Sequence, residues 1–127
     1  MKVYRVLIVE DDRVIAKSVR QHIEAWGFSA RTVRDFSDVM REFAEFDPHL
    51  VLMDIDMPEM DGIETAKRIM EMTDHMVPIL FVTALCDRQT VTLCRNLDAA
   101  GYIVRPYKPV FVKTEIKRIL MGRSEIE

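Results

Sequence analysis

The chain has 127 residues, 49% of them hydrophobic and 31% charged, and carries a net charge of −3 at pH 7. This length fits a single domain, and the ordinary balance of apolar and charged residues excludes a disordered chain, a collagen and a coiled-coil array. The slight acidity argues against direct nucleic-acid binding, and no apolar run approaches the ~20 residues that a membrane span needs.

Apolar stretches of β type alternate with segments of helical periodicity along the whole chain. The expected strands cover residues 3–9, 28–33, 50–53, 78–83 and 102–104. The first expected helix follows a cap at Asp11 or Asp12 and stops at Gly27, the second runs from a cap at Ser37 to Phe46, and the others cover 62–72, 88–97 and 110–121.

This alternation of strand and helix, without a hairpin signal between strands, predicts the α/β class. Parallel strands joined by right-handed helical crossovers form one sheet with helices on both of its faces. We expect the domain to cover residues 1–121 and residues 122–127 to form a polar C-terminal tail.

Polar side chains directly follow the expected strands, and in a parallel sheet those carboxyl ends lie along one edge, where ligands bind. The residues are Glu10, Asp11 and Asp12 after the first strand, Asp54 and Asp56 after the third, Thr83 at the end of the fourth and Arg105 after the fifth. Each acid alone could be a helix cap or a turn residue, but four segments that bring acids, a hydroxyl and a cation to one edge favour a shared site.

The chemistry of that edge indicates a magnesium-assisted phosphate site. Asp11, Asp12 and Asp54 would repel one another at close range, and Mg²⁺, which prefers carboxylate oxygens and water, would relieve the repulsion. A carboxylate can then attack phosphorus to form an aspartyl phosphate, while Thr83 donates its hydroxyl and Arg105 offers positive charge to the phosphoryl oxygens.

The remaining reactive side chains are expected to have structural roles. The three histidines have no metal-ligand spacing, and Met70, Met72 and Met76 are expected to fill gaps in the core. Cys86 and Cys94 are too far apart on one helix for a disulfide. Free thiols favour a cytoplasmic location. Cys86 is expected to be a packed thiol, and the alternative is that it is sensitive to oxidation.

Four motifs resemble the receiver domain of two-component response regulators, the CheY-like proteins. They are Val6-Leu7-Ile8-Val9-Glu10-Asp11-Asp12, Leu52-Met53-Asp54-Ile55-Asp56-Met57-Pro58-Glu59-Met60-Asp61-Gly62, Phe81-Val82-Thr83-Ala84 and the less regular Gly101-Tyr102-Ile103-Val104-Arg105-Pro106-Tyr107. The resemblance covers nearly the whole chain. It implies a flavodoxin-like, doubly wound sheet of five parallel strands in the order 2-1-3-4-5, with five helices.

The resemblance also implies a role for each matching residue. Asp54 matches the phosphoacceptor, Asp11 and Asp12 match the acidic pair that holds Mg²⁺, and Asp56 matches the residue whose backbone carbonyl binds the metal. Thr83 matches the hydroxyl that engages the phosphoryl group, and Tyr102 matches the aromatic residue that turns inward when this hydroxyl moves.

Arg105 departs from the family pattern, which has Lys before the proline of the fifth strand. Arg105-Pro106 fits the flanking residues better than Lys108-Pro109, which is the alternative match. Because Arg binds two oxygens at once and Lys is a compact point charge, the exchange affects the expected activation step more than phosphate binding.

The resemblance implies a phosphoacceptor with slow self-dephosphorylation at most. A sensor histidine kinase or a phosphotransfer protein would phosphorylate Asp54, and the face formed by helix 4, strand 5 and helix 5 would then change its binding of a downstream protein or of an output domain outside this chain. A phosphorylation-dependent dimer is possible, whereas contact with nucleic acid or insertion into a membrane is not expected.

Two other functions remain open. A degenerate receiver would bind proteins without phosphorylation, as Arg105 suggests. A haloacid-dehalogenase-type phosphatase would share the Asp54-Ile55-Asp56 pattern, but Met57-Pro58 and the position of the motif on the third strand argue against this enzyme.

Overall fold

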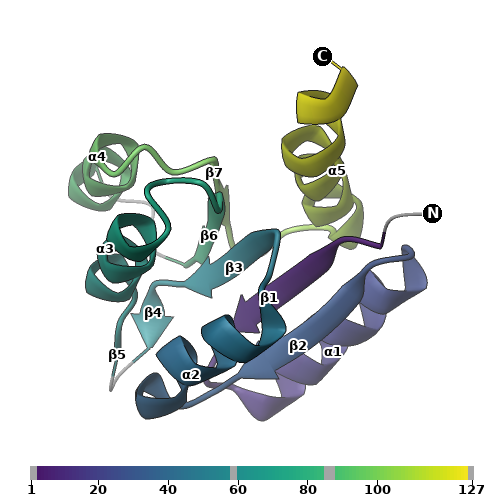
Figure 1. The fold of residues 1–127 in the computed structure, drawn as a ribbon, viewed down its shortest axis with the longest axis horizontal. Helices are drawn as coiled ribbons and strands as arrows, with labels where there is room; N and C mark the ends of the chain where they lie inside the picture. The colour runs from purple at the N-terminus through teal and green to yellow at the C-terminus, as the bar shows by residue number, and fades with distance from the viewer. Residues whose placement is uncertain (1–2, 58–59, 85–87, 126–127) are drawn as a thin grey trace.

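The computed structural model describes residues 3–57, 60–84 and 88–125 (Figure 1). The strands are β1 (Arg5–Val9), β2 (Ser29–Val33), β3 (Leu50–Asp54), β4 (Asp56–Met57), β5 (Met60–Asp61), β6 (Ile79–Thr83) and β7 (Gly101–Val104). The helices are α1 (Arg13–Ala25), α2 (Phe36–Phe46), α3 (Gly62–Met72), α4 (Arg88–Asn96) and α5 (Pro109–Glu125). The prediction for Cys86 lies outside the described residues.

The main sheet has five parallel strands in the order β2-β1-β3-β6-β7. Counted without the short β4 and β5, this is the predicted order 2-1-3-4-5, so the fold prediction is confirmed. The register pairs Val9 with Met53, Asp54 with Val82 and Thr83 with Val104. The carboxyl ends of the strands therefore lie along one edge of the sheet.

Alternate residues of the central strands face two separate hydrophobic cores. Leu7 and Val9 of β1 belong to the core that α2, α3 and α4 cover, whereas Val6 and Ile8 belong to the core that α1 and α5 cover. This double burial explains why the central strands read as continuous apolar runs in the sequence.

A short antiparallel pair was not predicted from the sequence. β4 and β5 pair Asp56 with Asp61 and Met57 with Met60, in the connection between β3 and α3. Each strand has two residues, too few for a period-two pattern to be visible.

Three local predictions differ from the structure. The N-cap of α2 is Asp35, and Ser37 lies inside the helix, so the predicted cap at Ser37 was wrong. Helix α5 continues to Glu125, beyond the predicted end at residue 121. Met70 is buried as predicted, but the side chains of Met72 and Met76 are 53% and 72% exposed and do not fill the core.

Within residues 3–57, 60–84 and 88–125, no helix combines the length and the apolar character that crossing a membrane requires.

Candidate functional site

The residues that follow the central strands meet at one edge of the sheet, as predicted. Asp54 ends β3 and Thr83 ends β6, and both are buried. Glu10, also buried, follows β1, and Arg105 follows β7. The arrangement results from parallel pairing, because each strand ends beside the end of its neighbour.

The guanidinium of Arg105 joins two of these strand ends. Its Nη1 lies 3.4 Å from Oδ2 of Asp54, and its Nη2 donates a hydrogen bond to Oε1 of Glu10. The backbone N–H of Arg105 donates to the carbonyl oxygen of Thr83 at 2.8 Å. Arg105 therefore contacts residues at the ends of β1, β3 and β6.

Three carboxylates form a group that could hold a metal ion. One oxygen from each of Glu10, Asp11 and Asp54 lies within 4.8 Å of the others. Hard oxygen donors at this spacing fit Mg²⁺, which commonly binds through a few carboxylates and several waters. The residues present are therefore suitable for the metal that the sequence indicates.

The acidic pair of this group is Glu10 and Asp11, one residue earlier than predicted. Asp12 is instead the N-cap of α1, and its Oδ1 accepts hydrogen bonds from the N–H groups of Val14 and Ile15 at 2.9 and 3.1 Å. An acid at this position satisfies helix N–H groups that have no partner in the helix. The alternative role of Asp12 as a cap is thus confirmed, and the described acids that lie close enough together to share a metal ion are Glu10, Asp11 and Asp54.

Asp56 begins β4. Its predicted role, the donation of a backbone carbonyl to the metal, stays a prediction.

Burial governs the ionisation of Glu10. It raises the pKa of Glu10 from 4.5 to about 8; the N–H of Asp12 and the charge of Arg105 lower the pKa, and the neighbouring Asp54 raises it. A carboxyl group removed from water loses the solvation of its charged form. The cation of Arg105 offsets only part of that loss.

Arg105 is held as a cation by the same neighbours. Burial opposes its charge, but the nearby carboxylates of Asp54 and Glu10 raise the pKa of Arg105 above its ordinary value. An arginine beside two acids remains protonated at every physiological pH.

Tyr107 is a site residue that the sequence analysis did not single out. It lines a small hollow together with Glu10, Asp54 and Arg105. Burial raises the pKa of its hydroxyl, and the neighbouring charge of Arg105 lowers it. The only sequence signal was an aromatic residue directly after Arg105-Pro106.

The position of Arg105 decides between the two possible matches to the family's Lys-Pro pair. Arg105 contacts Glu10 and Asp54, whereas Lys108 is exposed and lies directly before α5. The peptide bond between Arg105 and Pro106 is cis. Arg105-Pro106 is therefore the pair that reaches the acidic group.

Tyr102 lies in β7 and pairs with Phe81 of β6. It is partly buried and packs against the core beneath α2, α3 and α4. Phe81 and Thr83 are two residues apart in β6, so their side chains share a face of the sheet. Tyr102, which pairs with Phe81, lies on that same face as Thr83.

A wider groove lies beside the acidic site, between α1 and the β7–α5 connection. Its volume is about 650 Å³, and Ile15, Trp26, Arg105 and Tyr107 are among its lining residues. Arg105 and Tyr107 therefore border both the groove and the acidic site.

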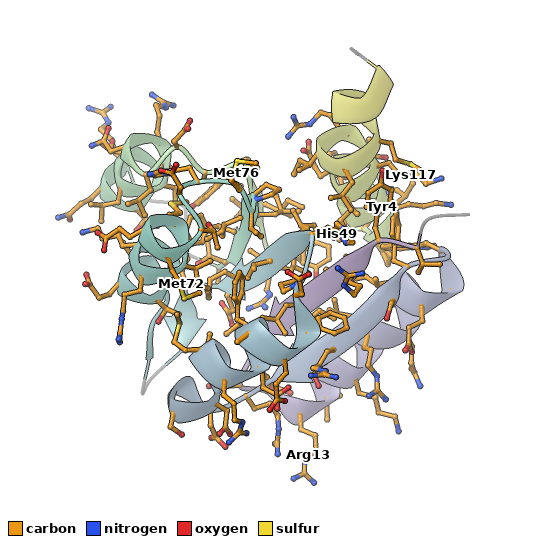
Figure 2. The ribbon with its side chains drawn as sticks, in the orientation of Figure 1. Tyr4, Arg13, His49, Met72, Met76 and Lys117 are labelled. Carbon is orange, nitrogen blue, oxygen red and sulfur yellow. The ribbon has the colours of Figure 1, made fainter. Side chains whose placement is uncertain are left out.

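His49 has a structural role, as expected for the histidines. Its Nδ1 accepts a hydrogen bond from the N–H of Arg5 at 2.9 Å, and its ring meets that of Tyr4 edge-on at 5.2 Å between centroids. Figure 2 shows this pair near the start of β1, whereas Glu10 follows the opposite end of that strand.

Comparison with known proteins supports the interpretation of this site. The family model for the response regulator receiver domain matches residues 6–117. A relative from Bacillus subtilis (strain 168), the uncharacterized transcriptional regulatory protein YvcP, is 32% identical over 117 residues, which are 92% of this chain and 48% of YvcP. The response regulator protein GraR of Staphylococcus saprophyticus is 31% identical over 102 residues, 80% of this chain and 45% of GraR.

Solved structures show the same fold. A CheY-like response regulator receiver domain protein from Methanospirillum hungatei JF-1 superimposes with a TM-score of 0.90 at 25% identity, covering 99% of this chain and 100% of that one. DrrB of Thermotoga maritima, an OmpR/PhoB homolog, superimposes with a TM-score of 0.85 at 24% identity, covering 96% of this chain and 54% of its own.

This chain spans about half the length of the two curated relatives, at 48% and 45%. The family match, in contrast, extends from Val6 in β1 to Lys117 in α5 and includes every strand end that forms the acidic site. The chain belongs to the response regulator receiver domain family.

Proposed function

We propose that this domain accepts a phosphoryl group on Asp54 from a histidine kinase or a phosphotransfer protein and thereby switches the binding of a partner. The observation that carries the proposal is the environment of Asp54. Its carboxylate is buried at the end of β3, belongs to a group of three acids within 4.8 Å, and faces the guanidinium of Arg105.

The side chains suit an in-line transfer. An oxygen of Asp54 attacks phosphorus, the bond between phosphorus and the donor's imidazole nitrogen breaks, and that nitrogen keeps the electron pair and takes up a proton. Mg²⁺, held by Glu10, Asp11, Asp54 and the carbonyl of Asp56, would supply positive charge to the phosphoryl oxygens. Thr83 donates its hydroxyl to the product.

The proposed output surface is the face formed by α4, β7 and α5. Each of these elements carries an exposed apolar side chain: Leu93 is 42%, Val104 37% and Phe111 63% exposed. Exposed apolar residues on adjoining elements are typical of a protein contact. A downstream protein, a second copy of the domain or an output domain would bind here, in the cytoplasm.

The test is the intact mass of the protein after incubation with acetyl phosphate, with Mg²⁺ or with EDTA. We expect the mass of one phosphoryl group to be added only when Mg²⁺ is present. No gain in either condition would contradict the proposal. Since we propose a phosphoacceptor without a separate substrate, steady turnover of a small phosphate ester would contradict it as well.

A second candidate function is protein binding that does not depend on phosphorylation. It is favoured by one observation, the engagement of both Glu10 and Asp54 by Arg105. The same mass measurement separates the two functions, because a domain that acts only by binding would gain no phosphoryl group.

A further inference from the structure

Arg105 contacts the acidic group where a metal ion would bind. Its guanidinium donates to Oε1 of Glu10 and lies 3.4 Å from Oδ2 of Asp54. The second oxygen of Glu10, Oε2, accepts a hydrogen bond from the N–H of Asp12 at 3.1 Å. Both carboxyl oxygens of Glu10 are therefore engaged by groups of the protein itself.

The backbone of Arg105 is anchored beside the acidic group, and its side chain is largely shielded from solvent. The backbone N–H of Arg105 donates to the carbonyl oxygen of Thr83, and Tyr107 lines the same small hollow. The Arg105 side chain is only 22% exposed, and those of Glu10 and Asp54 are 4% and 3% exposed. A charge buried among acids in this way cannot leave without exposing them to one another.

From these contacts we infer that Arg105 is an internal cation that competes with the divalent metal for Glu10 and Asp54. The inference rests on the proposed function of the acidic site and adds a residue that sets its metal affinity. To bind, a metal ion must displace at least one of the two guanidinium contacts. The domain then requires more Mg²⁺ than the same site would with a shorter cation at position 105.

The shape of the side chain is the reason for the effect. Arginine presents a planar fork of donors that can satisfy two carboxylates at once, whereas a lysine ammonium is a point charge. Lysine at position 105 would keep the charge but pair well with one acid at a time. The second acid would then be available to the metal.

The first test measures metal binding alone, without a phosphoryl donor. Mg²⁺ is titrated by calorimetry into the parent protein and into the Arg105→Lys and Arg105→Ala variants. We expect both variants to bind Mg²⁺ more tightly than the parent, by about tenfold, within the usual range of coupling between two linked binding events.

Arg13→Lys is the matched control. Arg13 is the first residue of α1, close in the chain to the acidic group, and Figure 2 shows its side chain pointing away from the fold. The substitution makes the same change from a fork to a point charge at an exposed position. It should leave the Mg²⁺ affinity unchanged.

The second test measures thermal stability. Without metal, Arg105→Ala leaves buried acids without their cation and should melt below the parent. Because a ligand that binds only the folded state stabilises it, Mg²⁺ should raise the melting temperature of Arg105→Ala more than that of the parent.

The outcomes separate this inference from the proposed function. Equal Mg²⁺ affinity in the parent, Arg105→Lys and Arg105→Ala would overturn the inference, while the proposed function would still stand if Asp54 gained a phosphoryl group. A loss of stability in Arg105→Ala that Mg²⁺ does not reverse would also overturn it. If no variant bound Mg²⁺ or gained a phosphoryl group, both would fail.

Discussion

The backbone N–H of Arg105 donates to the carbonyl oxygen of Thr83 at 2.8 Å, which joins the ends of β7 and β6. The side chain of the same arginine reaches Glu10 and Asp54. A change at the acidic group can therefore be transmitted through one residue to the backbone of Thr83. This connection is a physical route from the proposed phosphoacceptor to the face of β7.

Replacement of Asp54 by Asn should abolish phosphorylation. The amide keeps the shape of the side chain but has no anionic oxygen to attack phosphorus. Intact mass after acetyl phosphate and Mg²⁺ should show no added phosphoryl group. Asp35→Asn is the control, because Asp35 is exposed and makes no side-chain cap. Persistent phosphorylation of the Asp54→Asn protein would mean that another residue is the acceptor.

Replacement by Ala should have different effects on the stability of the metal-free protein at Asp11 and at Asp12. Crowding of like charges predicts that loss of either acid is stabilising, but Asp12 holds two N–H groups of α1. Asp12→Ala should therefore lower the free energy of unfolding by about 1 kcal/mol, the usual cost of losing an N-cap. Asp11→Ala should not destabilise the metal-free protein, but should reduce stabilisation by Mg²⁺.

Urea unfolding with Mg²⁺ and with EDTA measures both effects. The expected pattern has Asp12→Ala less stable than the parent in both conditions, and Asp11→Ala stabilised less by Mg²⁺ than the parent is. A more stable Asp12→Ala protein would show that charge repulsion outweighs the cap.

The contrast between Asp11 and Asp12 also shows where sequence reasoning stopped. Asp54, Thr83 and Arg105 were placed at the site because each follows a strand, and parallel pairing aligns strand ends. Three acids in a row follow β1, and their order does not reveal which one turns away to cap α1. That depends on the backbone of Asp12, whose φ and ψ of −78° and 116° are those of an N-cap.

Contacts between segments that are distant in the chain could not be predicted from the sequence pattern either. Tyr107 joins the site because the β7–α5 connection folds back towards β1 and β3, whose residues line the same hollow. The short strands β4 and β5 have two residues each, too few for a periodic pattern to be visible in the sequence. The main sheet was predictable because its central strands β1, β3 and β6 are apolar on both faces, and this pattern can be recognised in each strand by itself.

Glu10 should make the folded protein less stable as the pH rises. Its pKa is about 8 in the folded protein and 4.5 in an exposed chain, because burial disfavours its charged form. Between these values the folded state binds more protons than the unfolded state, so the free energy of unfolding falls with rising pH. The contribution is fully present below pH 4.5 and is lost as the pH passes through about 8.

Urea unfolding at several pH values in EDTA tests this sign. Glu10→Gln, which cannot ionise, should have a flatter dependence than the parent across the window. Glu71→Gln, at an exposed position of α3, should keep the parent's slope. A slope unchanged by Glu10→Gln would show that other groups cause it.

Gly62→Ala should shift the backbone that carries Asp54. A Cβ atom at position 62 would lie 2.7 Å from the carbonyl oxygen of Asp54 and 2.9 Å from Cα of Ile55, both backbone atoms. The substitution should cost about 1–3 kcal/mol, as overpacking usually does, and should slow phosphorylation of Asp54. At Gly101 the nearest atom is instead the end of the Leu80 side chain, which can move. In the Gly101→Ala variant, Asp54 should therefore be phosphorylated at the same rate as in the parent.

Arg105→Lys should strengthen the response to phosphorylation. A guanidinium satisfied by Glu10 and Asp54 at rest, and by phosphoryl oxygens afterwards, favours neither state strongly, and a group without differential contacts cannot shift an equilibrium. Lysine makes fewer contacts at rest, so its pairing with the phosphoryl group should draw the end of β7 further towards Asp54. The Tyr102 ring and partner binding should then change more between the two states.

This comparison must be made at equal phosphorylation, because Arg105→Lys also changes the metal requirement. With saturating Mg²⁺ and phosphoprotein quantified by mass, the NMR shift of the Tyr102 ring should be larger in Arg105→Lys than in the parent. Lys108→Ala is the control: Lys108 is exposed, so its loss should leave the shift unchanged. A smaller shift in Arg105→Lys would mean that the arginine fork itself drives the switch. A shift lost only in Lys108→Ala would mean that Lys108, not Arg105, transmits phosphorylation to β7.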